Sequence, residues 1–110
     1  MNIQIFGKKK SFDTKKAERY FKERRIKYQY VDLDRFGLSR RELESVRAAV
    51  GLEAMLDHDD PDYPMIAYLA SDQAKLEKLL EEPWLLRAPV VRNGRQATVG
   101  CCPEVWKTWE

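Results

Sequence analysis

The hydrophobic pattern of this 110-residue chain predicts an α/β fold with a mixed sheet, in the order β-α-β, helical insertion, β-β-α. Two observations carry the prediction. Near the N-terminus two short alternating segments flank a stretch with helical spacing, and near the C-terminus an apolar segment runs through Pro89 into two short strands. The length suits one domain over residues 1–110, with its core in 1–36 and 84–110 and the helical insertion at 37–83.

The first third of the chain is expected to form a strand–helix–strand unit. Residues 2–6 alternate as a half-buried strand does, and residues 27–33 alternate again. Between them, Ser11 or Asp13 can cap a helix that runs to about residue 25. A unit of this length normally joins two parallel strands through a right-handed crossover.

Helices are predicted through the middle of the chain. Ser39, with Glu42 three residues later, has the spacing of a capping box, and Gly51 ends the helix that follows. One further helical region is expected on both sides of Ser71, with Pro83 as its stop.

An acidic loop around His58 separates the predicted helices. Asp57, Asp59, Asp60 and Asp62 would suit a hard cation, but the glycine and the terminal glutamate of a calcium-binding loop are missing. No metal site is therefore expected.

The last part of the chain predicts a hairpin and a short helix. Pro89 leads into a β-branched strand, the chain turns at Asn93-Gly94, and a second strand returns to Gly100. A final helix begins near Pro103.

Composition and charge restrict the class of protein. Hydrophobic residues make up 44% and charged residues 35%, which excludes a disordered chain. No run reaches the about 18 apolar residues of a membrane span, and no signal peptide is visible, so we expect a cytoplasmic protein without a membrane partner.

The charge of the chain is distributed unevenly. Residues 1–27 carry ten Lys or Arg and three Asp or Glu, and the remainder has a local charge of −5. Such a basic segment indicates either an anionic partner or a solvated helix face.

Four segments together resemble the arsenate reductase (ArsC) family, which includes the Spx-type transcription regulators. They are residues 5–17, 26–33, 39–43 and 79–91, and the last has the most specific pattern. The resemblance covers essentially the whole chain. It implies a thioredoxin-like fold in which Pro89 is cis and lies against the loop between the first strand and the first helix.

The resemblance also implies an active-site loop whose cysteines this chain lacks. The family's nucleophile is a cysteine at the position of Ser11, and Spx-like and glutaredoxin-like members add a second cysteine at the position of Thr14. A helix N-terminus at this loop would stabilise a thiolate and bind an oxyanion. A serine has no comparable redox chemistry, and no neighbouring base is evident to activate it.

The arginines that hold the oxyanion in the family are missing as well. The resemblance places them at Ala88, with Arg87 one residue away, at Cys101, and near residues 56–57, where this chain is acidic. Conventional arsenate reductase activity is therefore not expected, and no cofactor is implied.

Two other groups could carry function. Lys8, Lys9 and Lys10 crowd a helix N-terminus, where positive charge is unfavourable, so with Ser11 they form either an anion site or an ordinary solvated loop. The partner would be a small oxyanion or a protein. Nucleic acid is not expected, because no binding motif is present.

The adjacent Cys101 and Cys102 are either a relocated redox pair or two small hydrophobic residues.

The sequence therefore supports two functions from different classes. The favoured one is a non-catalytic binding or regulatory module, since the Spx-type relatives act by binding RNA polymerase. The alternative is a thiol–disulfide oxidoreductase that uses Cys101 and Cys102.

Overall fold

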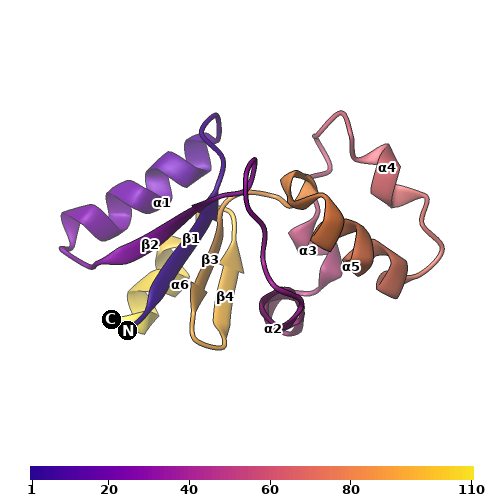
Figure 1. The fold of residues 1–110 in the computed structure, drawn as a ribbon. Coiled ribbons are helices and arrows are strands. Elements are labelled where there is room, and N and C mark those ends of the chain that lie inside the picture. Colours follow the sequence, from indigo (N-terminus) through magenta and orange to yellow (C-terminus); the bar gives the residue numbers. More distant parts are fainter.

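A computed structural model describes all of residues 1–110 and contains a four-stranded mixed sheet with helices on both faces (Figure 1). The strands lie in the spatial order β2-β1-β3-β4, where β1 is parallel to β2 and antiparallel to β3, and β3 is antiparallel to β4. Their bounds are β1 Ile3–Gly7, β2 Tyr28–Asp32, β3 Val90–Asn93 and β4 Gln96–Val99. The predicted α/β class and the parallel first pair are confirmed.

The first two long helices begin at the residues that the sequence predicts. Helix α1 (Phe12–Glu23) has Ser11 as its N-cap, and α2 (Arg40–Val50) begins with the capping box of Ser39 and Glu42. In this box the Ser39 hydroxyl accepts from the Glu42 N–H at 3.2 Å, and a Glu42 carboxylate oxygen accepts from the Ser39 N–H at 2.8 Å.

The helical region expected on both sides of Ser71 is divided into two helices, α4 (Pro64–Ala67) and α5 (Asp72–Glu81). Ser71 causes the break, because its backbone is extended and its hydroxyl caps α5 by accepting from the Ala74 N–H at 3.1 Å. A further short helix that the sequence does not predict, α3 (Leu52–Met55), follows α2 after a single residue.

The hairpin turn lies one residue later than predicted. Asn93 still pairs with Gln96, so the two-residue loop consists of Gly94 and Arg95 and not of Asn93 and Gly94. Gly94 has a φ of +62°, which a glycine adopts at low cost at the first position of such a loop. The chain then ends in α6 (Pro103–Trp106) and a 3-10 turn at Lys107–Trp109.

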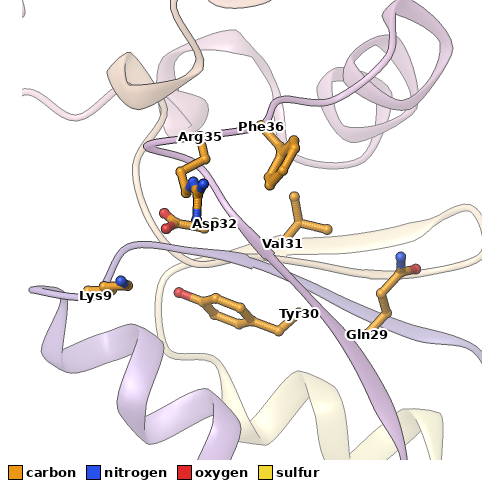
Figure 2. A pocket seen from close by; sticks show the side chains of 7 residues that line it. All are labelled: Lys9, Gln29, Tyr30, Val31, Asp32, Arg35 and Phe36. Atoms are coloured by element: carbon orange, nitrogen blue, oxygen red, sulfur yellow. The ribbon is translucent and has the colours of Figure 1, made fainter.

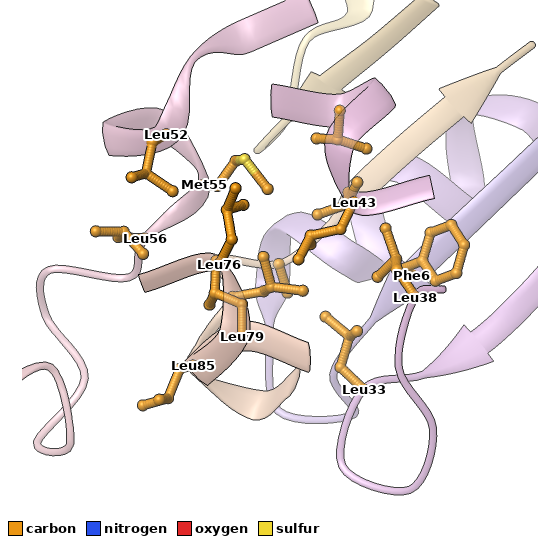
Figure 3. Close-up of a cluster of buried hydrophobic side chains, with 14 of the residues drawn as sticks. Phe6, Leu33, Leu38, Leu43, Leu52, Met55, Leu56, Leu76, Leu79 and Leu85 are labelled. Atoms are coloured by element: carbon orange, nitrogen blue, oxygen red, sulfur yellow. The ribbon is translucent and has the colours of Figure 1, made fainter. Parts of the chain in front are cut away.

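The sheet separates two hydrophobic clusters. The larger lies between the sheet and α2 to α5 and includes Phe6, Leu43, Met55 and Leu79 (Figure 3). The smaller packs α1 and α6 against the opposite face and consists of Ile3, Ile5, Ala17, Phe21, Val91 and Trp106. The Trp106 indole N–H donates to the buried Thr98 hydroxyl at 2.7 Å, which anchors α6 to the hairpin. No helix is both long and apolar enough to cross a membrane.

Candidate functional site

The loop between β1 and α1 is closed by the Ser11 and Thr14 side chains, at the two positions where the resemblance implies cysteines. The Ser11 hydroxyl accepts a hydrogen bond from the Thr14 N–H at 3.1 Å and so caps α1. The buried Thr14 hydroxyl accepts from the Lys8 N–H at 3.3 Å. Both hydroxyls therefore have a structural role, because each satisfies a main-chain donor that the loop would otherwise leave unpaired.

Gly7 allows this loop to close. A Cβ atom at Gly7 would lie 2.3 Å from the Thr14 Cγ2 and 3.0 Å from a ring carbon of Tyr30. No larger residue fits there unless the Thr14 side chain rotates away from its hydrogen bond with the Lys8 N–H or α1 moves away from the sheet.

The lysines of the loop are not gathered around a common point. The Lys8 ammonium lies 3.8 Å from a carboxylate oxygen of Asp57, and only 15% of the Lys8 side chain is exposed. Lys9 and Lys10 are exposed and form no ion pair. Lys8 thus connects the loop to the helical insertion, and its charge is balanced within the protein.

The segment around Asp57 lies beside the segment that leads into the hairpin. Leu56 forms an antiparallel bridge with Leu86, and the Arg87 N–H donates to the Met55 carbonyl at 2.9 Å. The resemblance places oxyanion-holding arginines in both segments, and the fold does bring the two together. In this chain an aspartate occupies the first of them.

The Ala88–Pro89 peptide bond, which leads into the hairpin, is cis. The preceding residue, Arg87, is exposed, and its side chain reaches Gly100 at the end of the hairpin. A Cβ atom at Gly100 would lie 3.2 Å from the Arg87 Nη2, so the guanidinium packs directly over that glycine. Gly100 also has a φ of +87°. Arg87 is thereby held beside the turn that precedes Cys102, where its positive charge opposes the rise in the pKa of the Cys102 thiol.

Both cysteines are free and partly buried. Burial raises the pKa of each thiol, and negative charge raises it further, from Asp13 at Cys101 and from Glu104 at Cys102. Cys102 in addition lies 3.5 Å from the Val99 carbonyl oxygen, to which its S–H donates. These surroundings favour the neutral thiol, whereas a redox nucleophile must form the thiolate.

The His58 side chain contacts Tyr63 and the main chain of Glu53. Its ring lies 4.6 Å from that of Tyr63, and its Nε2 lies 3.2 Å from the Glu53 carbonyl oxygen. Nowhere do three or more His, Cys, Asp or Glu side chains converge as metal ligands would.

Comparison with known proteins identifies the fold. No protein-family model matches the sequence, and neither does any curated protein. Among solved structures, the YffB protein is 24% identical, with a TM-score of 0.82 and 96% of each chain covered. Arsenate reductase from Vibrio cholerae is 23% identical, with a TM-score of 0.81, and 96% of this chain and 94% of that one are covered. A protein from Bacteroides fragilis described as related to the ArsC family is 18% identical, with a TM-score of 0.85 and full coverage of both chains.

These likenesses establish the fold. The chain has the thioredoxin-like α/β architecture of arsenate reductase structures over its whole length, as the sequence predicts.

Sequence reasoning missed one feature, which lies outside the β1–α1 loop. The outer edge of β2 borders a hollow of about 490 Å³ into which side chains from both faces of the sheet project (Figure 2). The signal in the sequence was the basic character of residues 1–27, but only the order of the strands reveals that β2 is an open edge.

Proposed function

We propose that this protein is a member of the arsenate reductase family that has become a non-catalytic binding module for an acidic protein surface. The observation that carries the proposal is the hydrogen bond from the Thr14 N–H to the Ser11 hydroxyl. It makes the position of the family's nucleophile a helix cap, and neither neighbouring thiol is set up to replace it.

The exposed side of α1 supports a protein as partner. Lys15, Arg19 and Lys22 line a hollow on this helix, and none of them forms an ion pair. The Phe12 side chain beside them is 78% exposed, with the Lys15 ammonium 5.7 Å from its ring centre. An exposed aromatic residue among unpaired cations is typical of a docking surface for an acidic partner.

A small oxyanion is less well accommodated. The Ser11 N–H donates to the Lys8 carbonyl at 3.0 Å, and the Thr14 N–H is occupied by the Ser11 hydroxyl. Two of the main-chain donors at the start of α1 are therefore occupied within the loop, which reduces the number left to surround an anion.

Two measurements test the proposal. First, the wild-type protein and a C101S/C102S variant are assayed for arsenate reduction and for exchange with a glutathione mixed disulfide; both are expected to be inactive. Second, binding of poly-L-glutamate is followed by tryptophan fluorescence. We expect binding that weakens as salt is added, is retained in C101S/C102S and is lost in a K15E/R19E variant. Thiol-dependent turnover in the wild type would instead establish the oxidoreductase alternative.

A further inference from the structure

The open edge of β2 has unsatisfied main-chain groups. β2 is the last strand on its side of the sheet, whereas α2 packs against β4 at the other end (Figure 1). The Leu33 N–H donates to the Gly7 carbonyl at 2.8 Å and so points toward β1. Because residues alternate in a parallel pair, the N–H and C=O groups of Tyr28 and Tyr30 point away from β1, toward the edge.

The hollows beside this edge follow the strand. The hollow in Figure 2 is lined by Tyr30, which packs with the α1 cluster, and by Val31, which packs with the cluster on the opposite face. A second hollow of about 620 Å³ includes Tyr28 and also Tyr30. The two hollows together extend along the whole of β2, and the first lies at the edge itself rather than on one face of the sheet.

The charges along the edge are unbalanced. Five basic side chains line the two hollows, and none of them forms an ion pair; they are Lys9, Lys22, Arg25, Lys27 and Arg35. The two acidic side chains there have partners within the fold. Glu18 accepts from the Tyr28 hydroxyl at 2.8 Å, and Asp32 accepts from the Asp34 N–H at 2.9 Å.

Arg25 occupies a position that suits glycine better. Its φ of +58° is left-handed, and the Ile26 N–H after it donates to the Phe21 carbonyl at 2.9 Å, as at a helix end that glycine usually terminates. An arginine occupies this position although its left-handed backbone conformation is less favourable than it would be for glycine. Such an outlier supports a role in binding at this site.

We propose that the edge of β2 binds an extended acidic peptide segment of a protein partner, which adds to the sheet as a fifth strand. This inference rests on the proposed function, and it specifies the surface that binds the partner and the chemistry of the bound segment. The outward N–H and C=O groups of Tyr28 and Tyr30 form a ladder with the peptide backbone, and the five basic side chains pair with its carboxylates.

Two other occupants fit less well. A second copy of this chain would bring the same basic side chains against each other, and like charges across a strand pair are destabilising. A single-stranded nucleic acid would match the charge, but it has no backbone that can continue a β-ladder.

The test uses a fluorescein-labelled peptide of three Glu-Val-Glu-Thr repeats and the full protein. We expect saturable binding by anisotropy and slower hydrogen exchange at the Tyr28 and Tyr30 amides. K9E/R35E should weaken binding about tenfold or more, whereas R41E/R95E, the same change in charge at exposed positions of α2 and the hairpin turn, should leave it unchanged. R25G should bind about threefold more weakly while it raises the melting temperature, which separates lost binding from lost folding.

Several results would overturn the edge site. One is equally tight binding of a control peptide that has Lys in place of Glu or that has a central proline. Another is tighter binding of oligothymidylate than of the acidic peptide. The last two are protection of the Tyr28 and Tyr30 amides by dimerisation in the absence of peptide, and hydrogen exchange at these amides that does not change when the peptide binds. If the acidic peptide fails these tests but poly-L-glutamate still binds through the α1 side chains, the edge site is wrong and the proposed function is retained. If neither the peptide nor poly-L-glutamate binds, both proposals are wrong.

Discussion

The β1–α1 loop and the outer edge of β2 lie on neighbouring strands and use their polar groups in opposite ways. In the loop, the Ser11 and Thr14 hydroxyls each satisfy a main-chain donor, and Lys8 is paired with Asp57. Along the β2 edge, main-chain groups face outward and five basic side chains have no ion-pair partner. The position that resembles a catalytic site thus stabilises the fold, and the unsatisfied groups available for binding lie elsewhere.

The largest effect is expected from Gly7→Ala. The added methyl would overlap the Thr14 Cγ2, so we expect the free energy of unfolding to fall by about 3 kcal/mol, as measured by urea denaturation. The double variant Gly7→Ala/Thr14→Ser is the control, because serine lacks the Cγ2 methyl but keeps the hydroxyl that accepts from the Lys8 N–H. It should be about 1 kcal/mol or more stable than Gly7→Ala. A double variant no more stable than Gly7→Ala would mean that this contact does not limit the packing of the loop.

Removing the cap of α1 should have an intermediate effect. Ser11→Ala leaves the Thr14 N–H without its acceptor, and we expect a loss of about 1 kcal/mol in the same denaturation experiment. Ser11→Asp should retain most of the stability, because a carboxylate caps as well and favours the positive end of the helix. A Ser11→Ala variant as stable as the wild type would contradict a structural role for this side chain.

The smallest effect is expected at the β2 edge, and it has the opposite sign. Arg25→Gly relieves the left-handed backbone and should stabilise the protein by about 0.5 kcal/mol, visible as a higher denaturation midpoint. A destabilised Arg25→Gly variant would show that this arginine supports the fold, which would remove the contrast between the two regions.

Local signals in the sequence predicted much of the fold. The capping box at Ser39 and the parallel strand pair follow from patterns within a few residues or one crossover. The hairpin turn was misplaced by one residue because Asn-Gly is a strong turn signal, while the pairing of Asn93 with Gln96 is set by the register across the sheet.

The site was less predictable, because it depends on contacts between distant segments. The sequence allowed Ser11 to be either a cap or the equivalent of a nucleophile, and only the geometry of its hydroxyl decides between them. The pairing of Lys8 with Asp57 joins residues far apart in the chain. The open edge at β2 follows from the order of all four strands, which no local pattern contains.

The central claim is that neither cysteine replaces the nucleophile that the resemblance to arsenate reductases places at Ser11, and pH-dependent alkylation tests it most directly. Burial raises the pKa of the Cys101 and Cys102 thiols, so the neutral form persists to higher pH than in the unfolded chain. We therefore expect both to react slowly at neutral pH, with rates that rise only above the ordinary thiol pKa of about 8.5.

A Ser11→Cys/Cys101→Ser/Cys102→Ser variant provides the comparison within the same fold. Its single thiol would lie at the N-terminus of α1, which lowers a thiol pKa, so it should react faster than either native cysteine at neutral pH. If Cys101 or Cys102 of the wild type instead reacts with a pKa well below 8.5, the protein has a working thiolate and the account of a non-catalytic module is wrong.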